Sequence, residues 1–106
     1  MPVVITTVLP PEATLEVVLE IESRIPTSYP DSFIAHAVTF DEGRQRVRLT
    51  DIWTSAQAHE QFFRENVLPV IEKAAAESGR QAPRPESQEV AETVVFFTGP
   101  GAAGGR

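Results

Sequence analysis

Cysteine is absent from this 106-residue sequence. Its absence excludes a disulfide framework, a thiolate metal site and a cysteine nucleophile. The two histidines, His36 and His59, are too far apart in sequence to form a metal-binding pair on one helix. The sequence therefore predicts no metal site.

Long apolar runs and an excess of positive charge are also absent. The apolar runs are far shorter than the roughly 20 residues that span a bilayer. A formal net charge of −6 repels nucleic-acid phosphates. Residues 1–12 carry neither the basic segment nor the small-residue cleavage site of an export signal. We therefore expect a cytoplasmic protein that binds neither membranes nor nucleic acid, and the preference for Arg over Lys favours a bacterial source.

The length favours one domain, which we place at residues 1–98. β-branched and aromatic runs predict strands, and apolar stripes with helical spacing predict helices. The predicted order is a strand at 3–9, a helix at 12–24, strands at 33–40 and 45–53, a helix capped by Thr54 or Ser55 and broken at Pro69, a short continuation ended by Gly79, and a strand at 90–98. Residues 99–106 have nothing to bury, so they predict a disordered tail.

This order is the split βαβ pattern of an α+β, ferredoxin-like fold, in which a four-stranded antiparallel sheet carries its helices on one face. The other face would expose Phe33, Ala35 and Ile52 to water. Because a domain of this size rarely leaves such a face uncovered, a second copy is expected to cover it. The sequence thus predicts a homodimer.

The turn between the second and third strands decides which side chains share a sheet face. Gly43 is expected to supply the positive φ of a tight turn. A loop of two or four residues pairs even positions with odd ones, whereas a three-residue loop breaks this grouping. With the even-odd pairing, one face collects the bulky apolar residues and is expected to lie against the helices: Ile34, His36, Val38, Phe40, Val47, Leu49, Asp51 and Trp53.

His36 and Asp51 then lie diagonally across a strand pair and within reach of each other. A histidine held by a carboxylate has a fixed tautomer, and its ordinary pKa of about 6.5 suits proton abstraction near neutral pH. Buried polar groups also pair for purely structural reasons. The pair is therefore a candidate catalytic dyad or a hydrogen bond of the core.

Four further side chains are predicted to line a ligand pocket beside this pair: Trp53, His59, Phe63 and Tyr29. Trp53 closes the third strand, where a large aromatic residue is core or pocket wall. His59 and Phe63 lie one helical turn apart, although an exposed histidine fits the first turn equally well. Tyr29 lies in a proline-bounded loop and is a pocket lid or a surface residue.

Other acidic residues do not predict a site. Glu16, Glu20 and Glu22 are expected to form a solvated helix face. The sequence has no phosphate-binding loop and no G-x-S-x-G motif.

The third strand ends in Asp51-Ile52-Trp53, a W-x-S step leads to Ser55, the helix continues as AHEQFF, and a break follows at LPVIEKA. These features resemble the antibiotic biosynthesis monooxygenase-like family of the dimeric α+β barrel proteins. The resemblance covers nearly all of residues 1–98 in element order. It implies that two protomers pack their sheets into a barrel and that each keeps a pocket between sheet and helices.

Members of such families include cofactor-independent oxygenases of aromatic polyketides, haem-degrading enzymes, isomerases and proteins without assigned activity. In the pattern of the haem-degrading members, the first strand carries an Asn, the third strand ends in a Trp and the next helix carries a His. Here the first strand has no Asn, and His59 follows Trp53 by only six positions. We therefore expect no specific haem binding.

Two functional hypotheses follow. The first is a small cofactor-independent enzyme of oxygenase, isomerase or cyclase type, which acts on a hydrophobic, aromatic or polyketide-like molecule with His36 and Asp51 as its acid-base pair. The second is a non-catalytic, ligand-binding or structural homodimer in which the same pair is a core hydrogen bond.

Overall fold

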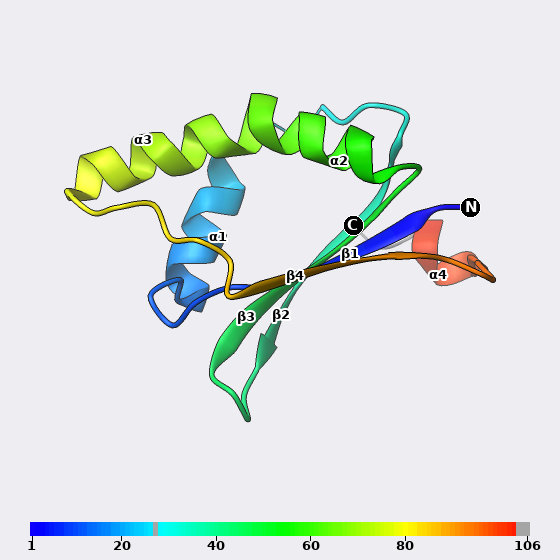
Figure 1. Cartoon of the computed structure of the whole chain (residues 1–106), viewed down its shortest axis with the longest axis horizontal. Helices are drawn as coiled ribbons and strands as arrows, with labels where there is room; N and C mark the ends of the chain where they lie inside the picture. The colour runs from blue at the N-terminus through cyan, green and yellow to red at the C-terminus, as the bar shows by residue number, and fades with distance from the viewer. Residues whose placement is uncertain (27, 104–106) are drawn as a thin grey trace.

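A computed structural model describes residues 1–26 and 28–103 as a sheet with its longer helices on one face (Figure 1). The strands are β1 (Val3–Val8), β2 (Phe33–Asp41), β3 (Arg46–Trp53) and β4 (Ser87–Glu92), and the helices are α1 (Leu15–Arg24), α2 (Ala56–Phe62), α3 (Leu68–Ser78) and α4 (Pro100–Ala103). The strands pair antiparallel in the order β2-β3-β1-β4. The predicted ferredoxin-like α+β fold is confirmed. In these two ranges no helix is long and apolar enough to cross a membrane.

Helix α1 begins where Thr14 caps it, three residues later than predicted. The hydroxyl of Thr14 accepts a hydrogen bond from the backbone N–H of Val17 at 3.3 Å. The helix ends at Arg24, just before Ile25 turns extended ahead of Pro26. Val18 is its buried residue, so α1 packs against the sheet through the centre of the predicted stripe.

Helices α2 and α3 join without the predicted break. Ser55, rather than Thr54, caps α2 and accepts from the N–H of Ala58 at 3.1 Å. A π-helical turn over Phe63–Val67 then leads directly into α3, with Pro69 in its first turn. A wider turn accommodates a missing N–H and the proline ring, which explains why the helical rod continues in Figure 1. Gly79 ends α3 at φ 69°, as predicted.

The β2–β3 hairpin confirms the even-odd register but not the role of its glycine. Asp41 pairs with Arg46, which leaves the loop 42–45 between them. The positive φ of 54° belongs to Gln45, and Gly43 has none. The expectation for Gly43 was therefore wrong, because a loop of this length places its left-handed residue next to the third strand.

A bulge in β2 overturns the prediction for the start of that strand. Phe33 pairs with Trp53 and Ala35 with Ile52, so Ile34 is the extra residue. Phe33 consequently lies on the helix side of the sheet, where its ring meets Trp53 edge-on with centroids 5.3 Å apart. Phe33 was expected on the open face. Ile34 was expected to continue the regular even-odd pairing on the helix face, and the bulge interrupts that pairing.

Two apolar clusters lie between the helices and the sheet. One is built from Val3, Ile5, Trp53 and Phe62. The other is built from Ala13, Val18 and Val47. The polar residues of the candidate site lie on the same face of the sheet, because β-strand side chains alternate between faces.

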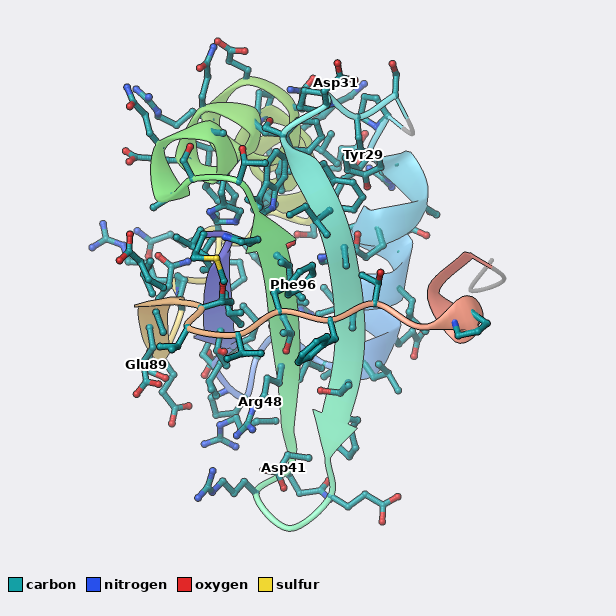
Figure 2. All side chains as sticks on the ribbon, turned by 90° about the vertical axis from the view of Figure 1, so that its right-hand side faces the viewer. Tyr29, Asp31, Asp41, Arg48, Glu89 and Phe96 are labelled. Atoms are coloured by element: carbon teal, nitrogen blue, oxygen red, sulfur yellow. The ribbon has the colours of Figure 1, made fainter. Side chains whose placement is uncertain are left out.

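Strand β4 lies earlier in the chain than predicted. Ser87–Glu92 pair with the whole of β1, and Thr93 N–H still bonds to the carbonyl of Pro2 at 2.9 Å. β1 has no residues left with which the described residues after 93 could pair, so these residues form no strand despite their high β-propensity. In Figure 2 this segment crosses in front of β3 and β2, with Phe96 over the sheet.

The predicted disordered tail falls partly within the described residues. Pro100–Ala103 form the short helix α4. Residues 104–106, which complete that prediction, lie outside the described residues.

Candidate functional site

His36 is held between two carboxylates that come from different elements. It lies on β2 directly opposite Asp51 on β3, rather than diagonally as predicted. Its Nδ1 is 2.7 Å from Oδ1 of Asp51, and its Nε2 is 2.5 Å from Oε1 of Glu22 on α1. The side chains are 23 % (His36), 11 % (Asp51) and 24 % (Glu22) exposed, so the group is largely shielded but still reaches solvent.

The two carboxylates determine the charge of His36. Its hydrogen bond to Asp51, and next that to Glu22, raise the pKa of His36 to about 10, while burial works in the opposite direction. At neutral pH the ring is therefore a cation that donates from both nitrogens. An imidazolium in this position holds a proton firmly, so it is a proton-holding group rather than a free base.

His59 on α2 completes the group from the other side of Asp51. Its Nε2 is 3.8 Å from Oδ2 of Asp51, a distance for ion pairing rather than a hydrogen bond. Burial lowers the pKa of His59; the carboxylate of Asp51 opposes this effect and the charge of His36 adds to it. At neutral pH the ring is neutral, and it makes no hydrogen bond within the described chain. His59 is only 18 % exposed, so it is not the exposed first-turn histidine of the alternative interpretation.

An aromatic cluster lies beside these polar groups. Trp53 is 1 % exposed and meets the ring of His59 edge-on with centroids 5.7 Å apart. Tyr29 stacks on Phe33 at 4.2 Å and on Phe62 at 5.1 Å, and so covers the cluster from the loop before β2 (Figure 2). The indole Nε1 of Trp53 is buried without a hydrogen-bond partner among the described residues.

The structure brings together five of the six residues predicted for the site. His36 and Asp51 are bonded, His59 and Trp53 adjoin them, and Tyr29 packs on the same aromatic cluster. Phe63 is half-buried at the start of the π-helical turn and is not part of this cluster.

Phe62, rather than the predicted Phe63, packs next to Trp53. The ring centroids of Phe62 and Trp53 are 5.4 Å apart. The helix is capped at Ser55, and Phe62 follows His59 by three positions. The side chains of His59 and Phe62 therefore lie on the same side of the helix. That spacing was available in the sequence as a signal.

Glu22 is the member of this polar group that the sequence interpretation missed. It was assigned to a solvated face with Glu16 and Glu20, which are indeed exposed. Glu22, however, lies four positions after the buried Val18 and therefore on the inward stripe of α1. A carboxylate within an apolar stripe was the signal that could have found it.

Cavities are found elsewhere, on the face of the sheet that the helices leave open. One of about 440 Å³ is lined by Val8, Arg44, Arg46, Glu86 and Ser87. A second of about 200 Å³ shares part of that lining. Within ranges 1–26 and 28–103 no group of three or more His, Cys, Asp or Glu residues is arranged to hold a metal ion.

The four-stranded antiparallel sheet with helices on one face is a fold that this chain shares with solved structures of other proteins. The chain is similar to a protein of Chloroflexus aurantiacus J-10-fl named as a candidate antibiotic biosynthesis monooxygenase, with 17% identity, a TM-score of 0.63, and coverage of 92% of this chain and 98% of that one. It is equally similar to Rv0793 of Mycobacterium tuberculosis, at 17% identity and TM-score 0.63 over 92% of this chain and 100% of the other.

A third similar structure is the haem degrader MhuD of M. tuberculosis with two haems bound in its active site. The identity is 18%, the TM-score is 0.52, and the match covers 92% of this chain and 100% of MhuD. No protein-family model and no curated protein matches the chain. The predicted resemblance is thus confirmed for the fold, and at these identities the fold alone is shared.

Proposed function

We propose that the chain is a small enzyme that needs no metal or organic cofactor and transfers a proton on a hydrophobic, aromatic or polyketide-like molecule. The observation that carries this proposal is the row Glu22, His36, Asp51 and His59, in which adjacent groups come from α1, β2, β3 and α2. Perturbed titratable groups gathered at one place are typical of acid-base sites.

In this proposal His36 and Asp51 set the charge of the site, and His59, rather than the predicted pair of His36 and Asp51, is the group that accepts the proton. His36 carries its charge permanently near neutral pH and fixes one oxygen of Asp51. The other oxygen faces Nε2 of His59, which leaves Nδ1 of His59 for a substrate. When Nδ1 takes an acidic C–H or O–H proton, the electron pair stays on the substrate as an enolate or phenolate.

Asp51 favours this transfer because its charge becomes better compensated. Before the transfer the group holds two carboxylates and one imidazolium, and afterwards a second imidazolium lies next to Asp51. Attraction between the new cation and the carboxylate stabilises the product of proton transfer in a partly buried site. The anionic substrate could then be reprotonated elsewhere, cyclise, or react with oxygen.

The aromatic cluster supports a hydrophobic substrate. Trp53 adjoins His59, and its buried indole N–H lacks an acceptor that a substrate oxygen would supply. The similarity to a candidate monooxygenase and to a haem degrader adds support for a ligand with conjugated rings.

A non-catalytic homodimer is the second candidate, and one observation favours it. Both ring nitrogens of His36 are occupied by carboxylates, which is what a purely structural hydrogen bond between α1, β2 and β3 would require. In this alternative the group ties the helix to the sheet, and the protein binds a ligand without converting it.

Association with a second copy is part of both proposals. The open sheet face carries one cross-strand row of apolar residues: Ala35, Ile52, Val4 and Ala91. Beyond β4, Val94, Val95 and Phe97 are 88%, 64% and 87% exposed. Exposed apolar side chains in one segment are typical of an interface. The cytoplasmic location and the bacterial source also remain proposals, which rest on the sequence alone.

The proposed function is tested by incubating the protein in air with hydroxylated aromatic and polyketide-like compounds, while product formation and oxygen uptake are followed. His59→Gln should reduce turnover by about 10²- to 10⁴-fold, the usual contribution of a general base. Asn66→Ala, on the same helical rod, is the matched control and should retain turnover. If His59→Gln turns over at the wild-type rate, the acid-base assignment is wrong.

A further inference from the structure

The open face of the sheet changes from apolar to charged along the strands. The row of Ala35, Ile52, Val4 and Ala91 lies at one end. Toward the hairpin follow Thr6 with Glu89, and then Val8 with Arg48 and Ser87. In Figure 2, Arg48 lies on the side of Phe96 that is toward Asp41 at the hairpin. The two cavities occupy this charged end.

The cavities adjoin each other, because Val8, Arg44 and Ser87 line both. Arg48 and Glu89 belong to the smaller one, of about 200 Å³. The larger one, of about 440 Å³, adds Arg46 and Glu86. Together they offer room for a small organic molecule at a surface that carries both signs of charge.

Arg46 is held through its Nε and Nη1 atoms and forms part of the wall. Its Nε donates to Glu86 at 2.7 Å, and its Nη1 donates to the carbonyls of Arg44 and Gln45 at 3.0 and 3.1 Å. These bonds fix the hairpin loop against the segment before β4. Arg46 and Glu86 therefore neutralise each other.

Arg44 and Arg48 are differently placed. Each approaches Oδ2 of Asp41 only at ion-pair distance, 3.8 and 3.7 Å, and within the described chain neither guanidinium makes a hydrogen bond. Nε of Arg48 is buried without a partner. Two guanidinium groups thus share one carboxylate, which leaves one positive charge and a donor fork suited to a carboxylate or phosphate.

Glu89 supplies the opposite charge on the same wall. It lines the smaller cavity, and among the described residues no Lys, Arg or His nitrogen lies within ion-pairing distance of its carboxylate. A purely anionic ligand would meet this charge as well as the net charge of −6 of the chain. A ligand that carries both signs would satisfy the two unpaired groups together.

We propose that this cavity binds a small zwitterion, whose carboxylate or phosphate lies at Arg44 and Arg48 and whose ammonium group lies at Glu89. The site is separate from the His36 group, which lies on the helix-covered face. The test of this proposal is therefore independent of the proposed enzymatic activity.

Matched probes of one length test the proposal by chemical-shift titration of backbone amides at low ionic strength. They are 4-aminobutyrate, which is zwitterionic, butyrate, which is only anionic, and butylammonium, which is only cationic. Glycine and 6-aminohexanoate extend the zwitterion series to shorter and longer charge separations. At least one zwitterion should shift the amides of β3 and β4 near Arg48 and Glu89 at about tenfold lower concentration than either half-probe, as expected for one added charged hydrogen bond.

Two variants and two controls complete the test. Arg48→Gln and Glu89→Gln should each weaken binding of that zwitterion about tenfold, whereas the exposed Arg80→Gln and Glu72→Gln should leave it unchanged. Glu89 is an exposed residue, so its variant is expected to fold. If butyrate binds as tightly as the best zwitterion, if Glu89→Gln strengthens binding, or if no zwitterion shifts these amides, the proposal is overturned.

Discussion

His36 lies directly opposite Asp51 in the β2–β3 hairpin, and the bond between Nδ1 and Oδ1 is 2.7 Å long. This pairing joins adjacent strands, while the second bond of His36, to Glu22, joins the strand to α1. A single imidazolium thereby connects three elements. Its protonation should consequently affect both the folding stability and the charge that His59 experiences.

The stability of the protein should fall at alkaline pH because of His36. The pKa of His36 is about 10 in the folded protein and about 6.5 when the ring is free. Because the folded value is the higher one, the stabilisation is complete below about pH 6.5 and is lost as pH rises toward 10. We expect the free energy of unfolding to decrease by on the order of 2–4 kcal/mol over this range.

Urea denaturation at pH 6.5, 8 and 10 measures this change. His36→Gln removes the titrating ring, so its stability should depend much less on pH across the same range. Other alkaline titrations are common to both proteins and cancel in the comparison. Equal slopes for the two proteins would show that His36 is not a buried cation.

Glu22 should control the titration of His36. Glu22→Gln removes one of the two carboxylates that raise the pKa of His36, so that pKa should fall. His59 titrates at a lower pH, at which His36 still carries its charge, so the pKa of His59 should remain below its ordinary value in this variant. Histidine ring C–H resonances followed by NMR across pH 5–11 measure both values.

Glu16→Gln is the matched control for this experiment. Glu16 belongs to the same helix and is exposed, and it has no ion pair within the described chain. The titration of His36 should be the same in this variant as in the wild type. A normal pKa for His36 in the wild-type protein would contradict the arrangement itself.

The sequence predicts the hairpin pair because its information is local. Strand alternation and an even-length loop suffice to bring His36 and Asp51 onto one face. The same argument fails at Ile34, where a bulge adds a residue that no local pattern indicates. A register is thus predictable as far as the strand pair remains regular.

Glu22 and β4 show where local information is insufficient. The bond between Glu22 and His36 depends on where α1 lies over the sheet, which is a tertiary property. Strand β4 is determined by the length of β1, its partner, so the strongest β-formers at 94–97 lie beyond it. Propensity predicts that a strand is present, whereas pairing decides which residues form it.

The chain should form a homodimer through the apolar row of the open sheet face and the segment after β4. Phe97→Ser removes an aromatic side chain that is 87% exposed in the single chain. Its loss should therefore have little effect on the folding of one chain but weaken dimerisation about tenfold or more, as for a central interface aromatic. Sedimentation equilibrium across micromolar concentrations measures the dimer dissociation constant.

Leu19→Ser is the control for this variant. Leu19 is 53% exposed on α1, on the opposite side of the sheet, so its replacement should leave dimerisation unchanged. A monomeric wild-type protein at micromolar concentration would exclude the homodimer. Equal effects of the two variants would place the interface elsewhere.

Haem should not bind at a specific site. The sequence has no Asn on β1, and the Nε2 atom of His59 faces Asp51. Titration with haem should therefore give only a weak, non-saturating change in the Soret band, equal in wild type and His59→Ala. A sharp band that saturates at one haem per chain and disappears in His59→Ala would contradict this expectation.

Asp51→Asn separates catalysis from structure at the centre of the site. The amide keeps the size of the carboxylate, so the fold should persist with a loss of about 1–3 kcal/mol for a weakened buried hydrogen bond. Without the charge, His36 loses the largest cause of its raised pKa, and His59 loses the partner that favours proton uptake. Turnover of an accepted aromatic substrate should then fall by about 10²-fold or more, well beyond the effect on stability.

Trp53 reports on binding in the same experiment, because it adjoins His59 and is the single tryptophan. An aromatic substrate should quench its fluorescence in a saturable way in both proteins, which shows that Asp51→Asn still binds. Urea denaturation supplies the stability of each. If Asp51→Asn turns over substrate normally while losing several kcal/mol of stability, the pair is a core hydrogen bond, and the non-catalytic homodimer is the correct interpretation.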